Sequence, residues 1–190
     1  MEQGDWNGTD LTGSLLVAMP AMGDERFERS VIYLCVHNAD GAMGLVVNRT
    51  VDELTLSGLL RQLDLEPGEA GEQPIHYGGP VETTRGFVLH STDYVQDSTL
   101  MVNDTIGLTA TVEILRAIAR GEGPKQRVLA LGYAGWAAGQ LDAEIQANGW
   151  LSVPADAGLV FGDDNDAKWG NAMAKIGIDP ALLSGEAGHA

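Results

Sequence analysis

Two histidines flank a segment rich in glycine, and their imidazoles could act as a base, as a proton relay or as metal ligands. His76 and His90 lie at the ends of HYGGPVETTRGFVLH, which is typical of two short strands around a turn. In such a hairpin the two imidazoles could converge. The segment is interpreted first as a chain corner, because Gly78 and Gly79 permit positive φ and Pro80 fixes the exit.

A metal site is not expected around these histidines. Zinc needs three or four protein ligands, and the sequence has no HExxH motif, no paired CxxC motif and no complete calcium loop. The acidic run at 163–166 is better explained as the charged start of a helix. We therefore predict neither a metal nor a cofactor.

A thiol–imidazole pair is the second candidate for chemistry. Cys35 and His37 are two residues apart in the strand-like stretch SVIYLCVHN, so they are expected to face the same side. Such a pair could form a nucleophile or a redox centre. A lone cysteine is more often a buried small hydrophobe, and no GxSxG motif offers a serine nucleophile. We predict no catalytic residues; a hydrolase or a thiol-dependent redox enzyme is the alternative.

A glycine-rich turn is the third candidate. Gly132-x-x-Gly135-x-x-x-Gly139 follows an expected strand at 127–136 and opens an expected helix at 137–149. Backbone N–H groups in such a turn can hold an anion, but neither phosphate-binding motif is present. The favoured interpretation is that the glycines let helix and sheet pack closely.

Three side chains at helical spacing follow this turn. Trp136, Gln140 and Glu144 stand at i, i+4 and i+8, so they are expected to share one helix face. Such a face could border a pocket, or it could be an ordinary amphipathic rim.

The elements that must position these residues alternate irregularly, which indicates a single α/β or α+β domain with a mixed sheet and packed helices. A hairpin is expected at Asp40-Gly41, and Thr55 and Thr109 are expected helix caps. Expected strands occupy 13–20, 30–37, 44–49, two parts of 76–90, 98–104, 127–136, WLSVPA and LVF; expected helices occupy 54–65, 110–121, 137–149 and 163–177.

The charge balance disfavours direct binding to nucleic acid. Eleven Lys and Arg stand against 27 Asp and Glu, a net charge of −16, and the basic residues form no dense run. DNA-binding proteins gain most of their non-specific affinity from Lys and Arg at phosphates. An anionic membrane surface is disfavoured for the same reason.

Length and cysteine content indicate a small cytoplasmic protein. The 190 residues suit one domain, expected at 11–190 after a flexible lead-in at 1–10. A single cysteine fits a reducing compartment. The acidic N-terminus does not resemble a signal peptide, and no apolar run reaches the length of a membrane span.

Five segments carry a family resemblance when read in order: LLVAMPAMGDERFERSVIYLCVHNADGAMGLVVNR, YGGPVETTRGFVLH, LALGYAGWAAGQLDAEIQANGWL, LVF and the C-terminal GHA. With them the chain resembles the AlgH/YqgE family of bacterial proteins over nearly its whole length. The resemblance implies a compact mixed fold with a bent or partly barrel-like sheet surrounded by helices. It implies no agreed catalytic residues, and one family member carries the label of a proposed transcriptional regulator.

Our hypothesis is a non-catalytic cytoplasmic protein that binds a small ligand or a protein partner and acts in regulation. The candidate ligand-binding residues are the positions that match recurrent family motifs: Pro20, Asn48, Gly78, Gly79, Pro80, His90, Gly132, Trp136, Gln140 and Glu144.

Overall fold

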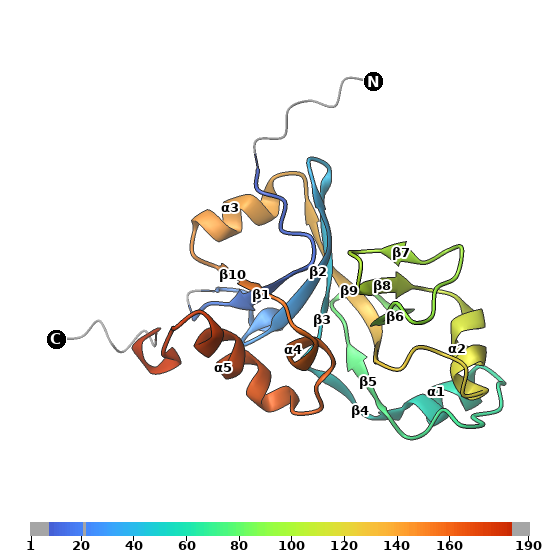
Figure 1. Ribbon diagram of the computed structural model, residues 1–190. Helices are drawn as coiled ribbons and strands as arrows, with labels where there is room; N and C mark the ends of the chain where they lie inside the picture. The colour runs from blue at the N-terminus through green and yellow to red at the C-terminus, as the bar shows by residue number, and fades with distance from the viewer. Residues whose placement is uncertain (1–7, 21, 184–190) are drawn as a thin grey trace, which may run out of the picture. The chain divides into compact units, whose positions relative to one another are not determined.

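The computed structural model describes residues 8–20 and 22–183 (Figure 1). Most of the expected flexible lead-in at 1–10 lies outside the described residues, and so does the C-terminal GHA motif. Over the described ranges, no helix is both long enough and apolar enough to cross a membrane.

By their contacts the residues group into two compact units. Unit 1 comprises Met1–Asn48 and Ala134–Ala190, and unit 2 comprises Arg49–Tyr133. Strand β9 (Arg127–Ala137) begins in unit 2 and ends in unit 1. Both units combine strands with helices, which confirms the mixed α+β class.

Unit 1 is built on an antiparallel sheet in the order β10-β1-β2-β3-β9. The hairpin predicted at Asp40-Gly41 joins β2 to β3, with Asn38 opposite Gly41. The central strand β2 is buried over nearly all its length, as its β-branched and aromatic residues predict. The bounds are β1 (Ser14–Ala18), β2 (Val31–Asn38), β3 (Gly41–Val46) and β10 (Trp150–Pro154).

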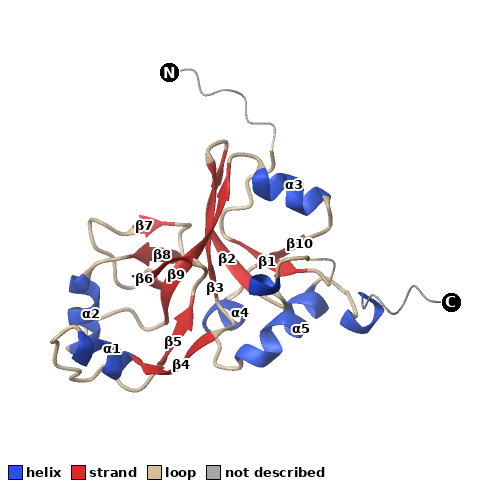
Figure 2. Ribbon diagram, turned by 180° about the vertical axis from the view of Figure 1, so that it is seen from behind, coloured by secondary structure: helices blue, strands red, loops and turns tan. Residues whose placement is uncertain are grey.

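Helices lie on both sides of this sheet (Figures 1 and 2). On one side, α3 packs against the strands through Leu141, and the other side carries α4 and α5. The side chain of Asp164 caps α5 by accepting from the backbone N–H of Ala167. The bounds are η1 (Glu25–Phe27), α3 (Gln140–Gln146), α4 (Ala157–Phe161), α5 (Asn165–Lys175) and η2 (Pro180–Leu183).

The strand expected in LVF is wrong, because these residues belong to α4. The side chain of Asp156 caps this helix by accepting from the N–H of Leu159 at 2.9 Å. A three-residue apolar run carries no periodicity that distinguishes a buried strand from a buried helical turn.

Unit 2 contains a mixed sheet and two helices. β9 pairs antiparallel with β6 and parallel with β5, where His76 lies opposite Ala130. β6 also pairs with β8, and β8 with the two-residue β7. The bounds are β4 (Thr50–Thr55), α1 (Leu56–Gln62), β5 (Pro74–Tyr77), β6 (Val81–Ser91), β7 (Leu100–Met101), β8 (Ile106–Thr109) and α2 (Val112–Ala119).

The strands of each unit are bent by irregular pairing. The β2–β3 register shifts between Leu34 and Val36, and the β6–β9 register shifts between Val81 and Gly86. Extra residues on one strand of a pair bend it and increase its twist. The mixed sheet expected from the alternating elements is confirmed, and so is the bending that the family resemblance implies.

Two local predictions in unit 2 need correction, and two of its strands were not predicted. Thr109 is a buried residue at the end of β8, and the cap of α2 is Thr111, whose hydroxyl accepts from the N–H of Ile114. The strand expected at 98–104 is reduced to β7. The strands β4 and β8 were not expected at all.

Lys168 of α5 is buried within unit 1. Its Nζ donates to the carbonyl oxygens of Val47 at 2.8 Å and Val160 at 3.1 Å, so it ties α5 to the end of β3 and to α4. Burial lowers the pKa of this amine to about 8, and the nearby charge of Asp163 opposes the shift. The folded protein therefore releases this proton more easily than the unfolded chain does.

This linkage predicts how stability depends on pH. Between about 8 and 10.5 the unfolded chain holds the Lys168 proton and the folded protein does not, so the free energy of unfolding rises with pH. Urea denaturation of the wild type and Lys168→Met at about pH 7.5 and about pH 10 measures this contribution. The wild type should gain stability relative to the variant at the higher pH. A difference that is constant or shrinks would contradict the assignment.

Candidate functional site

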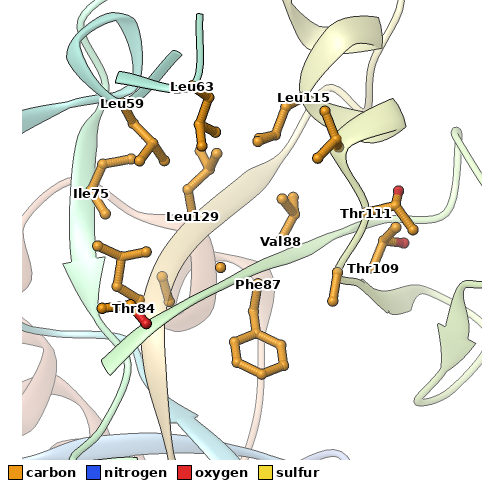
Figure 3. A pocket seen from close by; sticks show the side chains of 15 residues that line it. Leu59, Leu63, Ile75, Thr84, Phe87, Val88, Thr109, Thr111, Leu115 and Leu129 are labelled. Atoms are coloured by element: carbon orange, nitrogen blue, oxygen red, sulfur yellow. The ribbon is translucent and has the colours of Figure 1, made fainter. Parts of the chain in front are cut away.

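The candidate site is a pocket in unit 2 with a volume of about 190 Å³ (Figure 3). It lies between the two helices α1 and α2 and the strands of the sheet, and most of its wall is apolar. The residues that line it are Leu59, Leu63, Ile75, Thr84, Gly86, Phe87, Val88, Thr109, Ala110, Thr111, Val112, Leu115, Leu129, Ala130 and Leu131.

Local sequence determines where α1 begins and which faces of α1 and α2 turn toward the pocket. The hydroxyl of Thr55 caps α1 by accepting from the N–H of Gly58 at 3.2 Å, as predicted. Leu56 and Leu60 point to the core, so Leu59 and Leu63 fall toward the pocket. On α2, Ile114 and its neighbours on the same face are buried, which directs Val112 and Leu115 to the pocket.

Two apolar side chains at the pocket are partly exposed to solvent. Leu63 is 45% exposed and Val112 is 42% exposed, whereas Val88 and Leu129 on the sheet below are buried. Apolar groups that remain exposed around an apolar hollow favour a ligand that can cover them.

A row of hydrogen-bonded side chains adjoins the pocket at Thr109. His90 Nε2 lies 2.8 Å from the hydroxyl of Thr109, which lies 2.7 Å from the hydroxyl of Thr99. His90 Nδ1 lies 2.8 Å from the carbonyl of Ser91. A carbonyl only accepts, so Nδ1 carries the hydrogen; in the neutral ring Nε2 accepts from Thr109, and Thr109 accepts from Thr99.

The neutral form of His90 is favoured by its surroundings. Burial lowers the pKa of the imidazole, while the Ser91 carbonyl and the charge of Asp93 oppose the shift. Room for the ring comes from Gly107, where an added Cβ would lie 3.3 Å from His90 Cε1 and 2.7 Å from a methyl of Thr99. Thr109 was predicted as a helix cap, because no local pattern distinguishes a threonine at a strand end from one at a helix start, and Thr99 was not predicted as a site residue.

The two hairpin histidines do not converge. His76 pairs with Ala130 of β9, and His90 pairs with Arg127. Positions 127 and 130 are three residues apart on one strand, so the two imidazoles lie on opposite faces of the sheet. Within the described ranges, no group of three or more His, Cys, Asp or Glu could hold a metal ion.

The segment Gly78-Gly79-Pro80 is a corner between β5 and β6. The N–H of Gly78 donates to the carbonyl of Leu131 at 2.8 Å. Gly132, on β9, has φ +77°, and a Cβ there would lie 2.3 Å from the carbonyl oxygen of Gly79. The candidates Gly79 and Gly132 therefore form a close backbone contact, and this contact leaves no room for a ligand.

The predicted glycine-rich turn before a helix is wrong. Gly132 and Gly135 lie inside β9, and only Gly139 precedes α3. The strand continues because β9 pairs with β3 as far as Ala137, opposite Gly41. Local sequence could not show this pairing partner.

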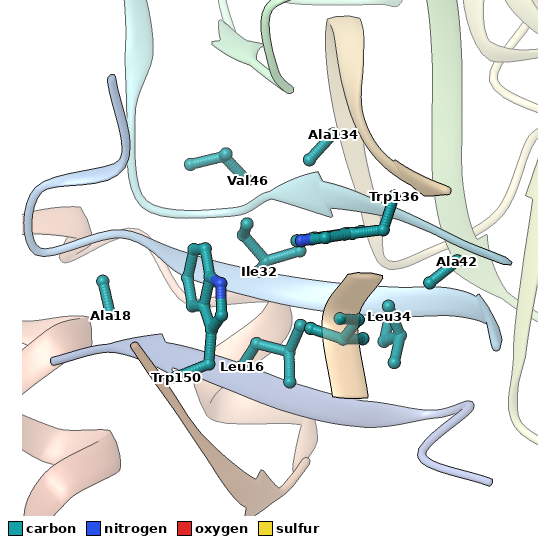
Figure 4. Close-up of a cluster of buried hydrophobic side chains, with 10 residues drawn as sticks. Leu16, Ala18, Ile32, Leu34, Ala42, Val46, Ala134, Trp136 and Trp150 are labelled. Atoms are coloured by element: carbon teal, nitrogen blue, oxygen red, sulfur yellow. The ribbon is translucent and has the colours of Figure 1, made fainter. Parts of the chain in front are cut away.

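The predicted helix face of Trp136, Gln140 and Glu144 is also wrong, because Trp136 belongs to β9 (Figure 4). Two of the three still meet: the carboxyl of Glu144 lies against the indoles of Trp136 and Trp150. Burial raises the pKa of this carboxyl, and the indole N–H groups oppose the rise by favouring its charged form. The side chain of Gln140 instead accepts from the N–H of Ala137 at 2.9 Å.

The remaining two candidates lie in unit 1. Pro20 lines a separate cavity there. Asn48 does not line it but fixes the chain beside it: its side chain accepts from the N–H of Val31 and donates to the carbonyl of Arg29, both at 2.9 Å.

The thiol alternative is disfavoured by burial. Cys35 is 2% exposed, and burial raises the pKa of its thiol to about 12, so the reactive thiolate is scarce at neutral pH. His37 is engaged elsewhere, since its Nδ1 accepts from the N–H of Leu11 at 3.1 Å and its Nε2 lies 3.3 Å from Asp142.

The close contact at Gly132 predicts the effect of a single methyl group. Gly132→Ala should lower the free energy of unfolding by at least about 2 kcal/mol, because the new Cβ meets a backbone oxygen and φ is positive. The control is Gly86→Ala on β6, where an added Cβ meets no atom within 4 Å, and the change should stay below about 1 kcal/mol. Urea denaturation measures both; equal losses would contradict the role given to Gly132.

Comparisons with known proteins place this fold in a family. Residues 15–181 match the sequence model of the family described as AlgH-like, DUF179. A UPF0301 protein of Bradyrhizobium diazoefficiens is 58% identical over 95% of this chain and 88% of its own length. A UPF0301 protein of Methylobacterium nodulans is 59% identical over 95% of this chain and 90% of its own.

Two solved structures have a similar fold. The solution structure of the AlgH protein from Pseudomonas aeruginosa matches with a TM-score of 0.79 and 42% identity, and the match covers 100% of both chains. The crystal structure of a Corynebacterium diphtheriae protein matches in fold with a TM-score of 0.74 at 24% identity, over 94% of this chain and 93% of that one. The chain therefore belongs to the AlgH-like family.

Proposed function

We propose that this protein is a non-catalytic regulatory protein whose unit 2 pocket binds the apolar part of a small ligand. The observation that carries this proposal is the partial exposure of Leu63 and Val112 around an apolar hollow of about 190 Å³. A ligand that covers water-exposed apolar side chains at a pocket lowers the free energy of the complex, because apolar surface is removed from water. The ligand would lie between α1 and α2, so that occupancy stabilises their packing on the sheet.

The dimensions and chemistry of the pocket limit the ligand. An engineered apolar cavity of about 150 Å³ binds benzene, so this pocket suits one ring or a short branched chain. Two of its three threonine hydroxyls have protein partners: Thr109 hydrogen-bonds with His90, and Thr111 donates to Gln96 Oε1 at 2.7 Å. Recognition would therefore rest mainly on shape and apolar contact.

Regulation through direct contact with DNA is disfavoured. The net charge of −16 opposes the approach of a polyanion, and the pocket offers no positive charge. A regulatory role would instead pass through the ligand and a protein partner.

A pocket-filling substitution tests the proposal. Gly86 lines the pocket, and an added Cβ there has no neighbour within 4 Å, so Gly86→Phe should place its ring in the pocket without backbone strain. The matched control is Gly170→Phe on α5, where a Cβ likewise has open space. Toluene, used as the apolar probe, should shift the methyl NMR signals of Leu59 and Leu115 in the wild type and the control. In Gly86→Phe these shifts should disappear.

Two outcomes would contradict the proposal. Absence of any shift in the wild type up to the solubility limit of toluene would show that the pocket does not accept apolar groups. Shifts that persist unchanged in Gly86→Phe would show that the probe binds elsewhere.

The enzyme alternative rests on the contact between Thr109 and His90, which has the geometry of a nucleophile and a base. Against it, His90 is fully buried and Thr109 is 1% exposed, so a substrate carbonyl has little access to the hydroxyl. Wild type and His90→Gln should hydrolyse p-nitrophenyl acetate at the same background rate. A rate that is above background and falls at least about tenfold in the variant would establish the hydrolase instead.

A further inference from the structure

Unit 1 contains its own cavity of about 270 Å³, which shares no lining residue with the unit 2 pocket. Its apolar wall includes Met19, Pro20, Met22 and Trp169, and Arg29 contributes a positive charge. Methionine side chains are flexible and polarizable, so they adapt to apolar groups of different shape.

The backbone of Arg29 is held in a conformation that arginine rarely adopts. Its φ is +53°, in the left-handed region, where a glycine would be free of strain. The Asn48 side chain fixes this loop by bonding the carbonyl of Arg29 and the N–H of Val31. An arginine at this position therefore costs stability, which is a reason to look for a role of its side chain.

Trp169 gives the guanidinium a fixed platform. The indole N–H donates to the carbonyl of Ala18 at 2.9 Å, which fixes the plane of the ring. The guanidinium carbon of Arg29 lies 5.1 Å from the ring centroid, in cation–π contact. Within residues 8–20 and 22–183 the Arg29 guanidinium makes no ion pair, so its N–H donors are open to an incoming anion.

We propose that this cavity binds a small monocarboxylic acid with an apolar body. The carboxylate would accept two parallel hydrogen bonds from the Arg29 guanidinium, the geometry in which arginine binds carboxylates best. The apolar body would lie against Met19, Met22 and Trp169. The carboxylate of Glu28 also lines the cavity and would repel a second negative charge, which disfavours phosphate and dicarboxylates. The proposal does not depend on the unit 2 pocket.

Phenylacetate is a suitable probe, and phenylacetamide is its neutral counterpart of the same shape. NMR titration should show phenylacetate perturbing the Trp169 indole signal, with phenylacetamide and inorganic phosphate at least about tenfold weaker. Arg29→Gln should weaken phenylacetate binding by at least about tenfold. The matched control is Arg26→Gln: Arg26 is exposed and pairs with Asp24 at 2.7 Å, and this variant should bind normally.

Two further variants keep the test decisive. Arg29→Gly removes the guanidinium where the backbone favours glycine, so it should fold with an unchanged or higher Tm and still lose binding. Gly86→Phe, which fills the unit 2 pocket, should bind phenylacetate as the wild type does.

Several results would overturn the proposal. These are no phenylacetate binding by the wild type at about 10 mM, normal binding by Arg29→Gly, or an equal loss in Arg26→Gln. Loss of binding in Gly86→Phe alone would move the site to unit 2. Tighter binding of a peptide with a C-terminal phenylalanine would assign the cavity to peptide termini rather than free acids.

Discussion

In the middle of β9 two backbone segments approach so closely that no side chain fits between them. Gly132 takes a left-handed φ there, and the carbonyl oxygen of Gly79 lies 2.3 Å from where a Cβ would be. The same strand pairs with β5 before this point in sequence, with β3 after it, and with β6 on both sides of it. The pairing of β9 with β5 and β6 beneath the apolar pocket therefore includes a close contact that only a glycine at position 132 allows.

The two cavities differ in how their polar groups are used. In unit 2 the hydroxyls of Thr109 and Thr111 are bonded to protein partners, so apolar surface dominates what a ligand would meet. In unit 1 a strained loop presents a guanidinium on an indole face, so a charge dominates. An acidic chain with few basic residues offers an anionic ligand few positive groups, so such a placement makes anion binding selective for this position.

Local signals in the sequence were sufficient to predict elements whose cap or turn is formed by residues near in sequence. The Asp40-Gly41 hairpin and the Thr55 cap of α1 were predicted because their chemistry lies within a few residues. The strand β4 could not be predicted in this way, since it carries acidic residues, none of its residues is buried, and only pairing with β5 makes it a strand. Its Glu53 even has φ +60°. Edge and bulged strands are determined by partners distant in sequence.

The candidate site was predictable only in part, for the same reason. His90 was identified from its neighbourhood, but its partner Thr109 is 19 residues away and was assigned to a helix cap. Trp136 and Glu144 were grouped correctly for an incorrect reason: a strand and a helix bring them together, where a single helix face was expected. Spacing along one element cannot reveal a contact that tertiary packing creates.

The row from His90 to Thr99 has a direction, and that direction can be reversed. With a neutral ring, each hydroxyl hydrogen points toward the histidine. A proton added at Nε2 would turn that atom into a donor, so Thr109 would have to accept from it and swing its own hydrogen toward Thr99. The hydroxyl at the pocket wall would thus change its orientation without any movement of the backbone. The protonation state of one buried imidazole would thus determine which way the Thr109 hydroxyl dipole points at the wall of an otherwise apolar pocket.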